Sequence, residues 1–275
     1  MRIRIYHETT YRYDQPAKYV IQSLRQEPRG HDGQMVREWR LDLDRDVHFR
    51  EAKDGLGNLV HTFSLDGPID QFTVTVIGVV DTFDTNGVVA GSAEAGPPAL
   101  FLRSTPLSAP DAAIREFAAE AVANAGSPLD RVHALNAALY DAMEFQTDSS
   151  TVETSAAVAF EAKSGVCQDY AHIFIAAMRS LGAPARYVSG YFRRTDGVDD
   201  QEASHAWAEV YVDDLGWVGF DPTHGLCVTE QHVRVAIGID YQSAAPTRGA
   251  HYGSGGETLN VQLSVTDGPF QNQQQ

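Results

Sequence analysis

Apolar and polar residues alternate strictly along much of the first hundred residues. Isoleucines alternate with arginines over residues 2–5, and Phe72, Val74 and Val76 alternate with threonines. A period of two is typical of strands that bury one face, and Asp-Gly and Gly-Asn pairs separate the runs as turns. We therefore predict an antiparallel β-sandwich domain over residues 1–103.

The period changes after a Pro/Gly-rich linker at residues 91–98. Apolar stripes at helical spacing predict helices over residues 108–126, 127–143 and 165–182, each bounded by capping or helix-breaking residues. A β-rich stretch follows. The strands that we expect there cover residues 185–191, 205–212, 217–221, 233–241 and 259–265.

The helical and strand patterns of this second half predict helices packed on an antiparallel sheet, so the fold class that we expect is α+β. We place this core at residues 104–267 and a flexible tail at residues 268–275. The polar, glutamine-rich end of the chain has no pattern of its own.

Charge and composition narrow the function. The chain has 21 Lys and Arg against 37 Asp and Glu, a formal net charge of -16. Nucleic-acid binders show the opposite balance, so no nucleic-acid partner is expected. The sequence shows neither a signal peptide nor an apolar run of the length that crosses a membrane. We expect a cytoplasmic protein without a membrane partner, in which Cys167 and Cys227 are free thiols.

Cys167 is the first candidate for chemistry. It follows Gly165-Val166 where the third helix is predicted to begin. A helix N-terminus presents unpaired N–H groups and positive partial charge, which favour a thiolate and could stabilise an oxyanion. Cys227 has no such setting and is expected to be structural.

His205 and Asp221 are the candidate partners of Cys167. Alternation places His205, Trp207, Glu209 and Tyr211 on one face of their strand. A short turn at residues 213–216 predicts a hairpin that would bring Asp221, the end of the next strand, beside His205. Asp221 would then orient the imidazole.

These segments resemble the motifs of a known family. Residues 165–172, 204–210 and 216–223 read GVCQDYAH, SHAWAEV and GWVGFDPT. They are similar to the cysteine, histidine and aspartate motifs of the bacterial transglutaminase-like superfamily. Residues 7–13, HETTYRY, resemble the β-rich N-terminal region that precedes this core in many bacterial members.

The resemblance implies a papain-like α+β core with a Cys-His-Asp triad, here Cys167, His205 and Asp221. It implies a cysteine peptidase or amide hydrolase that acts on a peptide or protein substrate, with no cofactor and no metal. Gln168 and Trp207 are tentative oxyanion or substrate residues. One departure is visible, since residues 238–241 read GIDY where family members often have GRDY.

Other functions stay open at this point. A thioester on Cys167 could be intercepted by an amine, which would make the protein a transglutaminase. A non-catalytic interaction module and a metal site built from Cys167, His205 and Asp221 are further alternatives, although no CxxC or HxxxH cluster supports metal. His172 is expected to serve packing or a hydrogen bond, and His224 is a reserve base. The sequence leaves the oligomeric state undetermined.

Overall fold

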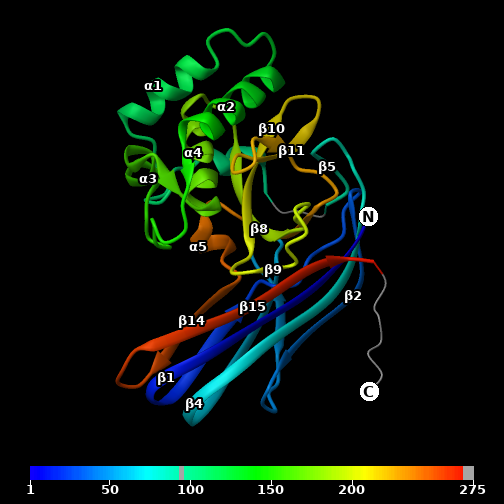
Figure 1. Cartoon of the computed structure of the whole chain (residues 1–275), viewed down its shortest axis with the longest axis vertical. Coiled ribbons are helices and arrows are strands. Elements are labelled where there is room, and N and C mark those ends of the chain that lie inside the picture. The colour runs from blue at the N-terminus through cyan, green and yellow to red at the C-terminus, as the bar shows by residue number, and fades with distance from the viewer. Residues whose placement is uncertain (93–95, 269–275) are drawn as a thin grey trace.

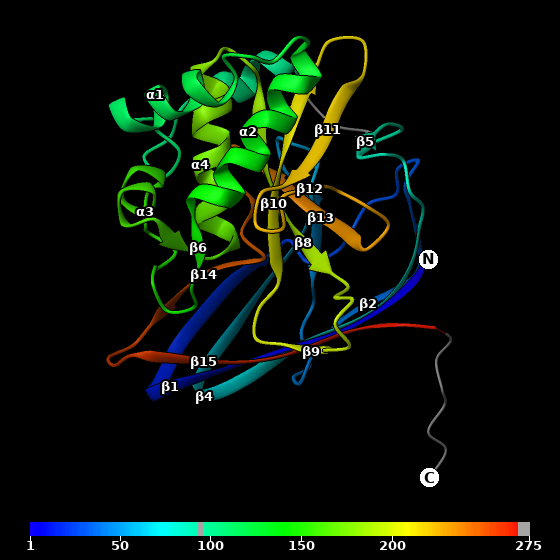
Figure 2. The same cartoon turned by 45° about the horizontal axis from the view of Figure 1, so that its top comes forward.

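The computed structural model describes residues 1–92 and 96–268. Two antiparallel sheets and a group of helices make up the molecule. The helices and the shorter sheet form one end, and long strands form the other (Figures 1 and 2). The α+β fold and the β-rich N-terminal region predicted from the sequence are confirmed. The tail predicted at residues 268–275 lies outside the described residues apart from Gly268.

The first sheet has seven strands and is built around two very long ones. The path runs β2-β4-β1-β15-β9, with β14 also paired to β1 and β3 paired to β4. Its strands are β1 Arg2–Leu24, β2 Gln34–Leu43, β3 Arg50–Lys53, β4 Leu59–Thr82, β9 Asp200–Gln201, β14 Thr247–Tyr252 and β15 Glu257–Asp267.

This sheet differs from the sandwich that we predicted, because backbone pairing joins the N-terminal strands into one sheet. The C-terminal strands β14 and β15 both pair with β1. Residues 247–267 therefore share a sheet with the N-terminal strands rather than with the helical core. The domain boundary predicted at residue 103 stays a prediction. Strands from both sides of this boundary pair in the first sheet, so the boundary does not separate the two sheets.

The second sheet has six strands in the order β12-β11-β10-β8-β13, with β5 paired to β11. Its members are β5 Val88–Val89, β8 Ala185–Phe192, β10 His205–Val212, β11 Gly216–Asp221, β12 Leu226–Cys227 and β13 His232–Gly238. A separate parallel pair joins β6 Glu144–Phe145 and β7 Ser164–Gly165. Strands β10 and β11 form the predicted hairpin, in which Val212 pairs with Gly216.

Helix α2 begins where its predicted cap lies, whereas α1 begins at Ala112 and not at the predicted residue 108. The Ser127 side chain and the Asp111 carboxylate cap α2 and α1, and Gly182 follows the end of α4 with a positive φ of 83°. The short helix α3 was not predicted from the sequence. The helical segments are η1 Pro98–Leu102, α1 Ala112–Ala121, α2 Pro128–Ala142, α3 Ala156–Ala162, α4 Cys167–Ser180 and α5 Tyr241–Ala244.

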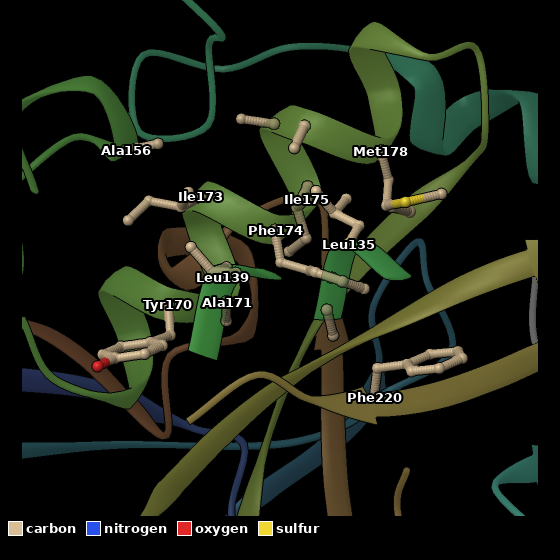
Figure 3. Close-up of a cluster of buried hydrophobic side chains, with 14 of the residues drawn as sticks. Leu135, Leu139, Ala156, Tyr170, Ala171, Ile173, Phe174, Ile175, Met178 and Phe220 are labelled. Atoms are coloured by element: carbon tan, nitrogen blue, oxygen red, sulfur yellow. The ribbon is translucent and has the colours of Figure 1, made fainter. Parts of the chain in front are cut away.

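Helix α4 forms the centre of the core. Every residue from Gln168 to Arg179 is buried, as expected of a helix surrounded by protein. Figure 3 shows side chains of α4 such as Phe174 beside Leu135 and Leu139 and above Phe220 of β11. The alanines and valines on the other face of β10 join the same cluster. These small residues let the helix lie close to the strand.

The face of β10 that bears His205 is stabilised by a buried ion network. Glu209, fully buried on that face, accepts hydrogen bonds from Arg186 of β8 at 2.6 Å and Arg234 of β13 at 2.7 Å. Burial would raise the pKa of Glu209, but the two arginines lower it to about 2. The network therefore links three adjacent strands of the second sheet.

Among the described residues, none of the helices is both long and apolar enough to span a bilayer.

Candidate active site

Cys167 is the first residue of α4 and is partly exposed. Its helix is capped by Asp169, whose Oδ2 accepts the Val166 N–H at 2.8 Å and the Ser150 hydroxyl. This carboxylate folds back so closely that a Cβ on Gly165 would lie 2.7 Å from it. Glycine at position 165 therefore permits the turn that presents Cys167.

His205 and Asp221 meet across the β10–β11 hairpin. The His205 Nε2–H donates to Asp221 Oδ2 at 2.7 Å. Burial alone would lower the pKa of His205, but the charge of Asp221, its hydrogen bond and the neighbouring Cys167 raise it to about 10. Because Nε2 is engaged by Asp221, Nδ1 is the ring nitrogen left for Cys167. The structure thus brings the three predicted residues together.

Asp221 accepts more hydrogen bonds than the sequence led us to expect. Its Oδ2 also accepts from His224 Nδ1 at 2.7 Å and His232 Nε2 at 3.1 Å, and its Oδ1 accepts the Thr223 N–H at 3.0 Å. Burial would raise the pKa of Asp221, but His205 and the hydrogen bonds from the three histidines hold it well below its usual range. The carboxylate is therefore ionised and fixed in place.

His232 was missed by the sequence reasoning. The Thr229 N–H donates to His232 Nδ1 at 3.2 Å, so the proton of a neutral ring lies on Nε2 and points at Asp221. Burial lowers the pKa of His232 and keeps the ring neutral. No local sequence pattern indicates that His232 contacts Asp221, because this contact depends on β13 lying next to β8 in the sheet. His224, three residues after Asp221, was noted only as a reserve base.

The same cluster has the composition of a metal site. Ligand atoms of His205, Asp221 and His232 lie within 4.8 Å of one another. In the present arrangement the His232 nitrogen that faces Asp221 carries a proton. A metal ion would have to displace that proton and the hydrogen bonds to Asp221. The cluster as it stands fits a hydrogen-bonded carboxylate better than a metal centre.

Gln168 and Trp207 lie near the site in different ways. The Gln168 side chain is buried and its Nε2 donates to the Val152 carbonyl at 3.4 Å. The Trp207 ring is 1% exposed and packs with Phe101 and other apolar residues. Its Nε1 finds no hydrogen-bond partner in the part of the chain that the structure describes. The proposed substrate roles of Gln168 and Trp207 stay predictions.

Two other expectations are confirmed. Cys167 and Cys227 are both free thiols, and burial raises the pKa of Cys227. His172 is fully buried and its Nε2 accepts the Tyr241 N–H at 3.0 Å. This histidine therefore connects α4 to α5 instead of facing the site.

Comparison with known proteins shows which family the chain resembles. Residues 115–222 match the transglutaminase-like superfamily model, and residues 3–81 match the bacterial transglutaminase-like N-terminal region. The uncharacterized protein Rv2569c of Mycobacterium tuberculosis is 30% identical, and the alignment covers 98% of this chain and 93% of that protein. A protein-glutamine gamma-glutamyltransferase of Pseudomonas aeruginosa is 31% identical over 34% of this chain and 15% of its own length.

A solved structure shares the fold over nearly the whole chain. This protein of Cytophaga hutchinsonii is named as a candidate cysteine protease, and it superposes with a TM-score of 0.77 at 23% identity. The match covers 98% of this chain and 92% of the other. The similarity therefore includes the N-terminal sheet as well as the core. On these matches, the chain belongs to the transglutaminase-like superfamily.

Proposed function

We propose that the protein is a cysteine-dependent amide hydrolase in which Cys167 is the nucleophile, His205 the acid and base, and Asp221 the orienting carboxylate. The observation that carries this proposal is the chain Asp221–His205–Cys167, in which His205 donates to Asp221 at 2.7 Å and lies close enough to Cys167 for that group to raise its pKa. An imidazole whose pKa is raised to about 10 holds its proton at neutral pH, and this is the proton that a leaving amine needs.

The reaction would pass through a thioester. The Cys167 sulfur attacks the amide carbon, and the carbonyl oxygen becomes an oxyanion that the Cys167 backbone N–H can stabilise. His205 then donates its proton to the nitrogen as the C–N bond breaks and the amine leaves. Water next attacks the thioester while His205 accepts its proton, and the C–S bond breaks to release the acid.

Amine transfer is the second candidate. It is favoured by the similarity of 34% of this chain to a protein named as a protein-glutamine gamma-glutamyltransferase. In that reaction a primary amine replaces water in the attack on the thioester. We favour hydrolysis because the solved structure that matches nearly the whole chain is named as a candidate cysteine protease.

The test compares Cys167→Ala with Cys227→Ala on a panel of peptide amides. Cys227 is the matched control because it is the other free thiol and lies outside the contact chain. We expect Cys167→Ala to lower turnover by at least about 1000-fold, and Cys227→Ala to retain it. Circular dichroism verifies that both variants are folded.

The same assay separates the two reactions. A glutamine-containing peptide is supplied with and without a labelled primary amine, and the acyl-enzyme is trapped and weighed by mass spectrometry. A thioester on Cys167 that yields mainly acid supports hydrolysis, whereas mainly labelled amide supports the transferase. Turnover that survives in Cys167→Ala would refute both.

A further inference from the structure

A cavity of about 370 Å³ lies between the first sheet and the catalytic core. This size falls in the range of ligand pockets, roughly 300–1,000 Å³. Side chains from one face of β1 form one wall, and β14 and β15 form another. Those that the argument uses are Tyr11, Tyr13, Gln22, Gln26, Gly249 and Glu257.

The cavity adjoins the site described above. Ser204, which lines it, directly precedes His205 on the approach to β10. Tyr241 also lines it, and the Tyr241 N–H is bound to His172 on α4, the helix that begins with Cys167. Neither Cys167 nor His205 lines the cavity, so a substrate bound at both would reach it through the side chain of a flanking residue.

Two glutamines at the cavity have acceptor atoms without a partner. Gln22 and Gln26 are 4% and 3% exposed, and neither Oε1 has a hydrogen-bond partner among the residues that the structure describes. A buried polar atom without a partner is costly, and both oxygens are closed off from solvent, so they would accept from a donor in the cavity once their amides turn toward it. Gly249 makes room for this arrangement, since a Cβ there would lie 2.6 Å from Gln22 Cγ.

The charges around the cavity also favour a hydrogen-bond donor. Glu257 contributes a carboxylate that is about a quarter exposed, and its nearest charged neighbour is His251 at 3.7 Å, a cation only when protonated. Among the described residues that line the cavity, none is a lysine or an arginine. Tyr11, Tyr13 and Tyr241 add aromatic rings, which attract cations. Acceptors, aromatic rings and one carboxylate together suit a positively charged donor.

We propose that this cavity is a substrate subsite for a basic side chain, a lysine ammonium or an arginine guanidinium, on the peptide whose amide bond is cleaved. The inference rests on the proposed hydrolase function and adds to it the class of substrate. It also assigns the N-terminal region a role, because β1 supplies most of the polar wall. Glu257 provides the charge, and the glutamines provide further acceptors once their amides turn toward the cavity.

The test uses peptides that are identical except for one residue near the scissile amide. Lysine, norleucine or glutamate is placed at each flanking position in turn, and kcat/KM is measured. At one position we expect lysine to exceed norleucine by at least about tenfold, the usual worth of a hydrogen bond to a charged group. Glu257→Gln should abolish that preference, so that the lysine and norleucine peptides have the same kcat/KM.

Two variants make the result specific. Glu257→Lys should reverse the preference toward the glutamate peptide, which a merely damaged protein would not do. Glu8→Gln removes the same charge from the opposite face of β1, where Glu8 contacts Tyr6, and should keep the lysine preference. Equal hydrolysis of all three peptides at every position would overturn the subsite and leave the hydrolase proposal intact.

A binding measurement covers the case in which no peptide is cleaved. The affinity of the lysine and norleucine peptides is measured by calorimetry on Cys167→Ala, and again after Glu257→Gln is added. Tighter binding of the lysine peptide that disappears with Glu257→Gln supports the subsite even if the hydrolase proposal fails. Equal affinities on Cys167→Ala would refute the subsite.

Discussion

At the scale of the residue, Asp221 is held by an unusual number of donors. Three histidine nitrogens and one backbone N–H point at its two oxygens. Because each donor stabilises the ionised form, the carboxylate stays charged although it is fully buried. That charge, together with the Asp221–His205 hydrogen bond and the neighbouring Cys167, outweighs the effect of burial on the pKa of His205.

Removing this charge should therefore change how His205 titrates. In Asp221→Asn we expect the pKa of His205 to fall from about 10 by roughly 1–3 units, the usual effect of one adjacent opposite charge. The measurement is an NMR titration of the histidine ring signals. Asp213→Asn, in the exposed turn between β10 and β11, is the control. An unchanged His205 titration would show that Asp221 does not set its pKa.

At the scale of the element, α4 depends on contacts at both its start and its middle. Asp169 and Gly165 determine the turn before Cys167. Farther along, His172 accepts a hydrogen bond from the first residue of α5. A protonated His172 has no lone pair on Nε2 for that bond, so the contact requires the neutral ring.

This contact predicts a specific sensitivity to acid. Burial lowers the pKa of His172 from 6.5 to about 4. The unfolded chain thus takes up a proton below pH 6.5 that the folded chain resists, so stability is lost as the pH falls from 6.5 to about 4. The depression of about 2.5 pKa units corresponds to about 3 kcal/mol.

The measurement is urea denaturation at both ends of that pH range. In His172→Gln, whose amide oxygen can still accept the Tyr241 N–H, the loss of stability should shrink by about 2–3 kcal/mol. His48→Gln, at an exposed position, should lose as much stability as the wild type does. Identical pH dependence in His172→Gln and wild type would contradict the assignment of this proton.

At the scale of the whole molecule, the two sheets are joined by side-chain amides. Strand β13 is at the edge of the second sheet, and amides from the N-terminal region pair with its backbone. Asn58 donates to the Ile237 carbonyl and accepts the Ile237 N–H, both at 2.8 Å. Gln34 pairs with the Arg234 backbone in the same way. These contacts satisfy an edge that would otherwise be open.

We therefore expect the two parts to unfold together and to depend on these amides. Asn58→Ala removes both hydrogen bonds that Asn58 makes with the Ile237 backbone. Because the Ile237 N–H and carbonyl then stay buried without these bonds, the free energy of unfolding should fall by about 2–4 kcal/mol. Asn260→Ala, at an exposed position of β15, should have little effect. Urea denaturation followed by tryptophan fluorescence and by circular dichroism measures both variants. Two separate transitions in the wild type would contradict the expected coupling.

Much of the local structure was determined by the sequence. The period-two runs predicted the long strands, Ser127 and Gly182 marked helix ends, and a short turn predicted the hairpin between β10 and β11. These features depend on residues a few positions apart. For the same reason the position of Cys167 at the start of α4, and the approach of Asp221 to His205, could be predicted.

Only the tertiary structure decided what lies beside these elements. His232 reaches Asp221 because β13 pairs with β8, and residues 247–267 return to the first sheet because β14 and β15 pair with β1. The cavity exists only where these distant segments meet the core. Pairing between remote strands is selected by the packing of the whole chain, whereas helix caps, turns and alternation are governed by local sterics and hydrogen bonds.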